Sequence, residues 1–305
     1  MFQFVIKRIL MMIPVLLAVS TIVFLLIHVI PGDPVDIILG EQALAADRAE
    51  LAHEMHLDLP LATQYARFVG GLAEGDWGRS IFDGRPVLSH LKERAGATFI
   101  LALCAMSIAI LVAIPAGIIA AVKRGGLWDR AMMVMALAGI SVPNFWLGPV
   151  LILIFSVHFR LLPISGGSSV ASLILPAVTL GFGVAAMISR LTRASMMEEI
   201  RREYMTTARA KGLSERTVMY KHALRNALNP VISIVGLQVG SLLAGAIITE
   251  RVFGWPGIGM LLIDSISRRD YPVVSGCVLA ISFAYVIINT ATDCLYKVAD
   301  PRIKL

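Results

Sequence analysis

The sequence predicts an all-α polytopic membrane protein with six transmembrane helices. Of its 305 residues, 57% are hydrophobic and only 16% are charged, a composition too apolar for an ordinary soluble protein. Several apolar runs exceed the roughly 18 residues that mark a membrane-spanning helix. The formal net charge of +6 comes from basic residues that cluster beside these runs, which is the positive-inside pattern rather than a nucleic-acid site.

The first transmembrane helix is assigned to residues 1–30, where a long apolar run follows Lys7 and Arg8. This run is too long for a cleaved signal peptide, and no Ala-x-Ala site follows it. The Pro-Gly-Asp-Pro sequence of residues 31–34 ends the helix, because proline removes a donor and restricts the residue before it. The polar segment 31–97 is predicted to be an extracytoplasmic subdomain.

Within this subdomain we expect a helix near residues 42–55 and an amphipathic stretch over residues 57–80. His53 and His56 lie three residues apart and invite a metal interpretation. The zincin pattern needs one residue more, and no third ligand is evident. The sequence therefore predicts no metal site.

Residues 98–305 are predicted to form a five-helix membrane core. Its spans are expected over residues 98–122, 131–157, 171–189, 228–249 and 273–296. Pro143 and Asn144 interrupt the third span, which indicates either a packing kink or an unwound stretch beside a cavity. In the fifth span, Gly236, Gly240 and Ala244 recur every four residues, a spacing that lets another helix approach closely in lipid.

A charged segment separates the fourth and fifth spans, over about residues 195–227. Between residues 190 and 225 nine basic residues outnumber four acidic ones, which places this segment, and with it both termini, in the cytoplasm. Its pattern predicts two short helices joined at Gly212, the second capped by Ser214. We interpret it as a knob that another protein grips.

No catalytic motif is found: the sequence lacks a Gly-x-Ser-x-Gly elbow, a His-Glu-x-x-His pair and a Walker loop. A chain without a nucleotide site cannot couple ATP to work by itself, so energy must enter through a partner. The alternative is an ATP-independent channel or a membrane scaffold. A membrane enzyme is a more distant alternative.

The chain resembles, from end to end, the B-type permease subunit of the dipeptide/oligopeptide (peptide/nickel) ABC importers. The resemblance is carried by stretches in matching order, among them PGDP, GDWGRS, SVPNFWLG, ILPAVTLG, GAIITERVFGWPGIG and DPRIKL. It implies the fold of a type I ABC importer permease.

In that family the cytoplasmic loop carries an EAA pattern, Glu-Ala-Ala-x-x-x-Gly, and forms a coupling helix that docks on an ATPase subunit. Thr206 and Thr207 occupy the Glu and first Ala positions, Ala208 the second Ala and Gly212 the Gly. The glutamate is therefore absent. Ala210 keeps the small character of the helix, and Arg209 and Lys211 are expected to reach acidic groups on the partner.

The resemblance further implies a second homologous permease, two ABC ATPase subunits that hold ATP and Mg²⁺, and an extracytoplasmic substrate-binding protein received by the outer segments. The chain itself is expected to hold no cofactor and to lie among the lipids of a bacterial or archaeal inner membrane. Spans three to five would line the pathway. The candidate pathway or helix-packing residues are Pro143, Asn144, Gly236, Gln238, Gly240 and Ala244.

The substrate implied by the resemblance is a dipeptide or another short peptide. Related permeases carry nickel chelates, glutathione or oligosaccharides, and these remain alternatives.

Overall fold

The computed structural model describes residues 2–29, 44–54, 58–167 and 169–299. The described residues form helices and no strand, apart from an isolated antiparallel bridge between Arg79 and Pro86. Five of the helices are long and apolar enough to cross a membrane, and a bent helix pair brings the number of candidate spans to six. The prediction of an all-α protein with six spans is confirmed at this level.

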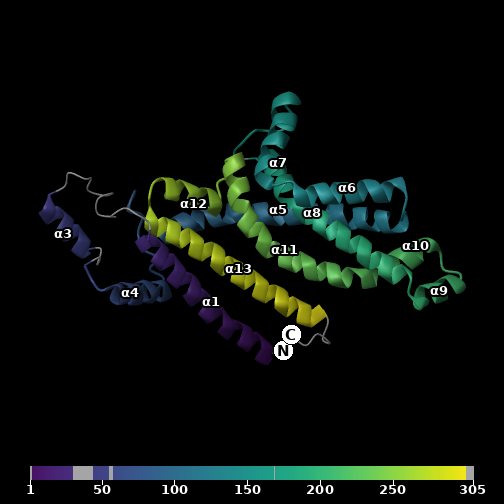
Figure 1. Ribbon diagram of the computed structural model, residues 1–305, viewed down its shortest axis with the longest axis horizontal. Coiled ribbons are helices and arrows are strands. Elements are labelled where there is room, and N and C mark those ends of the chain that lie inside the picture. Colours follow the sequence, from purple (N-terminus) through teal and green to yellow (C-terminus); the bar gives the residue numbers. More distant parts are fainter. Residues whose placement is uncertain (1, 30–43, 55–57, 168, 300–305) are drawn as a thin grey trace. The chain divides into compact units, whose positions relative to one another are not determined.

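The helices of the chain are labelled in Figure 1, and by their contacts the residues divide into two compact units. The first comprises Met1–Gly96 and Gly257–Val286, and the second Ala97–Pro256 and Ile287–Leu305. This division by contacts differs from the domain ranges expected from the sequence, which stay a prediction. The Pro-Gly-Asp-Pro sequence at 31–34 lies outside the described residues.

The first unit contains α1 (Phe2–Val29), α3 (Ala45–Glu54), α4 (Leu61–Glu74) and α12 (Ile258–Ser267). Helix α4 is the predicted amphipathic stretch, and it ends at Gly75 in the left-handed conformation. The hydroxyl groups of Thr21 and Tyr65 share a hydrogen bond of 2.7 Å between α1 and α4. In the same unit, the Ser80 hydroxyl donates to the buried Asp270 carboxylate at 2.5 Å.

Helix α5 (Val87–Val122) begins 11 residues earlier than the second span was expected to begin. The prediction used the apolar run, which marks the stretch that fits a bilayer. Helix formation does not stop at that boundary, because His90, Lys92 and Glu93 are compatible with a helix in water. The helix therefore extends beyond the apolar run.

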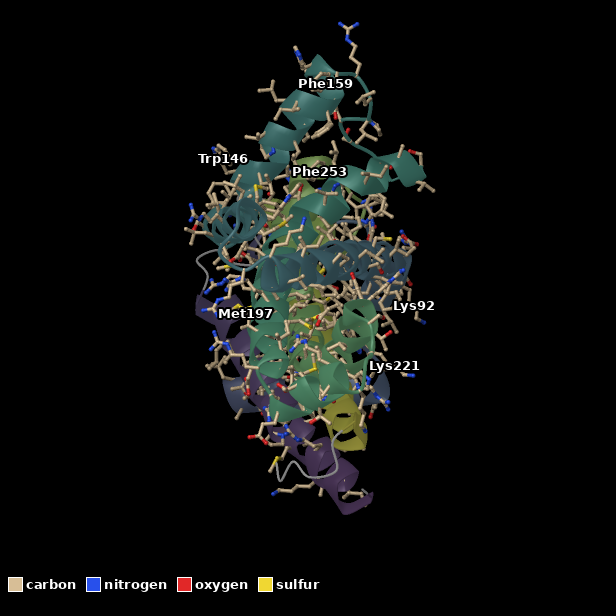
Figure 2. The ribbon with its side chains drawn as sticks, turned by 90° about the vertical axis from the view of Figure 1, so that its right-hand side faces the viewer. Lys92, Trp146, Phe159, Met197, Lys221 and Phe253 are labelled. Atoms are coloured by element: carbon tan, nitrogen blue, oxygen red, sulfur yellow. The ribbon has the colours of Figure 1, made fainter. Side chains whose placement is uncertain are left out.

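The third span is broken. Helix α6 (Leu127–Ser141) and the run formed by α7 (Asn144–Leu151) with the π-helical η1 (Ile152–His158) meet at 111°. Val142 is extended, as expected for a residue before proline. In Figure 2, Trp146 and Phe159 mark the α7–η1 run, and both rings are more than half exposed.

Helix α8 (Val170–Ile200) is the central element of the second unit and packs against α6 and α11 (Leu224–Phe253). Small residues set these crossings. A Cβ atom on Gly139 of α6 would lie 2.6 Å from the Ala186 Cβ atom, and one on Gly181 would lie 2.6 Å from the Ala105 carbonyl oxygen of α5. Small residues at these positions allow the helix backbones to come close together, which stabilises helix packing in lipid.

The last helix is α13 (Tyr271–Ala299). Its Thr292 hydroxyl donates to the Gly236 carbonyl oxygen of α11 at 3.4 Å, within the second unit.

Gly181→Ala is expected to lower stability by about 1–3 kcal/mol, because the added methyl group meets a backbone carbonyl that cannot move alone. Gly96→Ala is the matched control, since nothing lies within 4 Å of a Cβ at Gly96 and alanine favours a helix. Thermal unfolding of the detergent-solubilised variants measures both effects. Equal midpoints for the two variants would show that close approach at Gly181 does not matter.

Candidate functional site

The charged segment between α8 and α11 folds as two short helices around Gly212, as the sequence predicts. Helix α9 (Glu203–Ala210) starts after a two-residue turn at the end of α8, and α10 (Glu215–Thr217) follows Gly212. Ser214 caps α10 by accepting a hydrogen bond from the Thr217 N–H at 3.4 Å. This segment is the candidate site, because it is the charged element through which a second protein could act.

A glycine is required at position 212 because of the backbone conformation there, and not because a side chain would lack space. Its φ of +77° lies in the left-handed region, and nothing lies within 4 Å of a Cβ placed there. The Gly212 N–H donates to the Arg209 carbonyl at 2.9 Å, and the Leu213 N–H donates to the Ala208 carbonyl at 3.4 Å. These bonds close the C-terminus of α9 and turn the chain into α10.

The second short helix is not separate from the fifth span. Helix α10 continues through the π-helical η2 (Val218–Ala223) into α11, so that one helical run extends over Glu215–Phe253. The fifth span was expected to begin near Leu228, and the structure starts this run 13 residues earlier. Helix α10 and the fifth span therefore share one continuous helical backbone.

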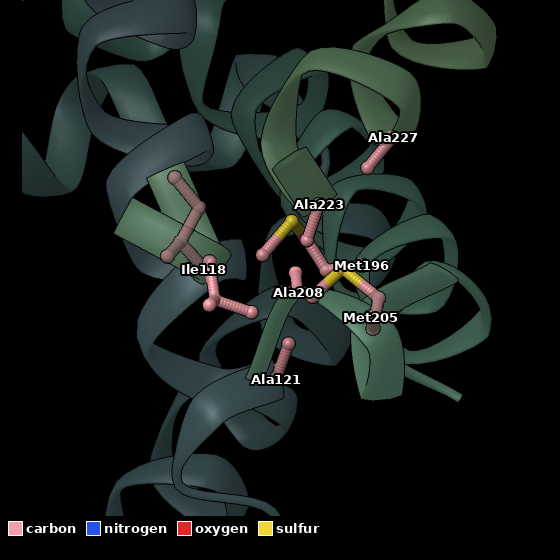
Figure 3. Close-up of a cluster of buried hydrophobic side chains, with 8 residues drawn as sticks. Ile118, Ala121, Met196, Met205, Ala208, Ala223 and Ala227 are labelled. Atoms are coloured by element: carbon pink, nitrogen blue, oxygen red, sulfur yellow. The ribbon is translucent and has the colours of Figure 1, made fainter. Parts of the chain in front are cut away.

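The inner face of α9 is buried against the second unit. Figure 3 shows Met205 and Ala208 of α9 among side chains from α5, α8, η2 and α11. Met205 is fully buried and Ala208 is 6% exposed. The remaining members of the buried cluster are Ile118, Ala121, Met196, Val218, Ala223 and Ala227. This cluster, here called the α9 anchor, fixes the short helix on the ends of three long ones.

The structure separates the predicted coupling residues into two groups. Ala208 points into the α9 anchor and belongs to the chain's own core. The others are exposed to solvent: Thr206, Thr207, Arg209, Ala210, Lys211 and Gly212. An external partner can therefore contact this second group, here called the outer face of α9, whereas Ala208 acts by holding α9 in place.

Tyr204 joins three elements at the edge of the α9 anchor. Its hydroxyl donates to the Glu199 carboxylate of α8 at 2.5 Å and accepts from the Asn226 side-chain amide of α11 at 3.0 Å. Burial and the bond to Glu199 raise the pKa of Tyr204 above its ordinary value. The neutral hydroxyl that links α8, α9 and α11 is therefore favoured.

Arg209 has a partner within the chain. Its Nε atom lies 2.7 Å from the Glu215 carboxylate, across the turn at Gly212. Both side chains are exposed, and such surface pairs contribute about 0–1 kcal/mol. Arg209 can exchange this partner for an acidic group on another protein at small cost.

Asp129 and Arg193 form a partly buried ion pair in the second unit. Arg193 of α8 donates from Nε and Nη2 to the two carboxylate oxygens of Asp129, at 2.6 and 2.9 Å, and the Gly125 N–H donates to the same carboxylate. Asp129 is 5% exposed. The pair ties the α5–α6 turn to α8, next to the candidate site. Sequence reasoning missed it, because no local pattern links residues 64 positions apart.

Comparison with known proteins identifies the family. Residues 113–305 match the family described as the binding-protein-dependent transport system inner membrane component, and residues 1–102 match the N-terminal family of such membrane components. The chain belongs to this family. The dipeptide transport system permease protein of Escherichia coli is 42% identical over 336 aligned positions, which cover 100% of this chain and 99% of that protein.

Two further curated relatives are similar over their whole length. The di/tripeptide transport system permease protein of Pseudomonas aeruginosa is 43% identical, and the glutathione transport system permease protein of Pectobacterium atrosepticum is 44% identical; each alignment covers 100% of this chain and 99% of the relative. A crystal structure of an amino acid ABC transporter with histidines matches with a TM-score of 0.52 at 15% identity, over 71% of this chain and 95% of that one. It supports the ABC permease fold.

This family member is therefore a multi-pass inner-membrane permease. The predicted pathway residues do not share one environment in it. Pro143 is exposed at the start of α7, and Asn144 is half-buried, with its amide 3.7 Å from the Cβ position of Gly245 on α11. The four residues on α11 differ in burial: Gly240 is buried, Gly236 and Gln238 are half-buried and Ala244 is exposed. Their role in a pathway stays a prediction.

Among the described residues of the permease, no group of three or more His, Cys, Asp or Glu side chains is placed to hold a metal ion. The Nδ1 atom of His53 lies 2.8 Å from the Asp58 carboxylate. His56 lies outside the described residues.

Gly212→Val is expected to distort the turn between α9 and α10, because a left-handed conformation costs an ordinary L-residue about 1–2 kcal/mol. Trypsin should then cleave the permease at Lys211 or Arg216 about fivefold faster or more. Gly212→Asn is the control, since asparagine tolerates this conformation. Equal cleavage rates for the two variants would contradict a conformational requirement at Gly212.

Asp129→Ala is expected to destabilise the permease by about 3 kcal/mol or more, because Arg193 loses its partner in a largely buried position. Replacing both residues by leucine should recover much of the loss, since no uncompensated charge remains. Thermal unfolding in detergent provides the measurement, with Glu50→Ala as an exposed control. A loss no larger than that of the control would show that the pair is not a structural link.

Proposed function

We propose that the chain is the permease subunit of an ABC importer for dipeptides or short peptides. End-to-end identity of 42–43% to dipeptide and di/tripeptide permeases supports the substrate class. The observation that carries the coupling role is the outer face of α9, a short exposed helix held rigidly at the ends of α5, α8 and α11. A connecting loop needs no such anchor.

In this proposal, partner ATPases bind ATP and Mg²⁺ and dock on the outer face of α9. The permease supplies no nucleotide site and no cofactor. ATP-driven closure of the partners moves α9, and the α9 anchor transmits the movement to α5 and α8. The continuous backbone through η2 transmits it to α11, so that the bundle alternates between inward and outward access.

The assembly that we propose contains this subunit, a second homologous permease, two ABC ATPase subunits and an extracytoplasmic binding protein. Both termini and the 195–227 loop would lie in the cytoplasm, in accord with the excess of basic residues. For the binding protein we propose a charged pocket of about 230 Å³ in the first unit, lined among others by Asp83, Arg85, Glu93 and Arg268.

Glutathione is the second candidate substrate, because a glutathione permease is as similar as the dipeptide permeases are. Nickel chelates and oligosaccharides are further alternatives from the wider family. The ATPase rate of the purified complex with its binding protein distinguishes them: we expect stimulation by dipeptides rather than by glutathione or nickel. An ATP-independent channel is contradicted if uptake stops when ATP is omitted.

Ala210→Leu is expected to reduce peptide uptake by about tenfold or more and to leave folding intact, because a large side chain on the outer face of α9 prevents close docking. Ala208→Leu is the matched variant: two residues away, it overpacks the α9 anchor and should lower stability by about 1–3 kcal/mol. Uptake by membrane vesicles and thermal unfolding are measured for both.

Normal uptake with Ala210→Leu would overturn the assignment of the docking face. Destabilisation by Ala210→Leu, equal to that of Ala208→Leu, would show that both residues are structural. Co-purification of the ATPase subunits provides the third readout, since the proposal expects Ala210→Leu to weaken it.

A further inference from the structure

A groove lies beside the candidate site, in the second unit, where α5 ends and α10 begins. Its volume is about 720 Å³. Its walls are aliphatic and aromatic: Ile118, Ile119, Val122, Trp128, Met219 and Tyr220. Trp128 is 57% exposed and Tyr220 is 56% exposed. In a membrane protein, exposed apolar surface of this kind faces lipid or another protein.

Two cations complete the lining of the groove. Lys123 follows the last residue of α5, and its Nζ atom lies 5.4 Å from the centroid of the Trp128 ring. Arg216 lies on α10 on the other side. The one acidic residue of the lining, Glu215, is already bonded to Arg209 at 2.7 Å. The groove therefore presents apolar walls together with uncompensated positive charge.

The location of the groove indicates which kind of molecule binds in it. The groove lies where the apolar run of α5 ends at Lys123, the level at which the boundary between hydrocarbon and water is expected. Tryptophan and tyrosine favour this level of a membrane. Basic pockets between helices on the cytoplasmic side bind anionic headgroups. The matching molecule has a long apolar tail and a negative head.

We propose that this groove binds an anionic phospholipid, with an acyl chain against Ile119 and Trp128 and the headgroup between Lys123 and Arg216. The bound lipid bridges the α5–α6 turn and the start of the α10–α11 run, and so steadies the segment that carries α9. The proposal rests on the proposed cytoplasmic placement of this segment, and it does not depend on which substrate is transported.

The test places the photo-cross-linking residue p-benzoylphenylalanine at Tyr220, where it replaces one aromatic ring by another. A second strain carries it at Phe145 of α7, which is exposed and outside the groove. Full-length protein is irradiated in the cell membrane, and mass spectrometry identifies the adducts. We expect phosphatidylglycerol or cardiolipin adducts at Tyr220 to exceed their share at Phe145 by about fivefold or more, given roughly 1 kcal/mol for each cation.

A second experiment keeps the cross-linking residue at Tyr220 and compares the lipid adducts formed by variants that differ in charge. Lys123→Gln with Arg216→Gln should lower the anionic share at Tyr220 to that of bulk lipid, while Arg130→Gln, which removes an exposed charge outside the groove, should not change it. An unchanged anionic share in the double variant would overturn the proposal. So would a protein adduct at Tyr220 in place of lipid, because the groove would then be a docking surface.

Discussion

The burial of Met205 and Ala208 is the interaction on which the candidate site depends. Helix α9 has only eight residues, and a helix of this length is not stable alone in water. Its stability and its direction come from the apolar contacts that it makes with α5, α8, η2 and α11. The same contacts leave Thr206, Ala210 and Lys211 pointing away from the chain, so one packing event creates both the anchor and the outer face.

The anchor is effective because α8 is itself tightly held. At Gly139 and Gly181 the neighbouring helices approach so closely that a single methyl group would clash, and in lipid such contact replaces the hydrophobic driving force available in water. Near the C-terminal end of α8, Arg193 is bonded to Asp129 of α6. Helix α9 thus packs on a helix that is in close contact with its neighbours.

Local features were predictable from the sequence and long-range ones were not. Gly212, Ser214 and the break at Pro143 follow from chemistry within a few residues, and the structure has each of them. The early start of α5, the merging of α10 with α11 and the burial of Ala208 were missed. Apolar runs mark the bilayer rather than helix ends, and the burial of a small residue depends on partners as distant as Ile118 and Ala227.

A proline interrupts the backbone hydrogen bonds of α11 a short distance beyond the α9 anchor. The π-helical η2 is held by the anchor through Val218 and Ala223, and the anchor ends at Ala227. Pro230 follows within one turn and cannot donate a hydrogen bond to the carbonyl of residue 226. The side-chain amide of the same residue, Asn226, donates a hydrogen bond to the Tyr204 hydroxyl. A bend in α11 is therefore expected at Pro230, and up to that point the α9 anchor joins α9, η2 and the start of α11.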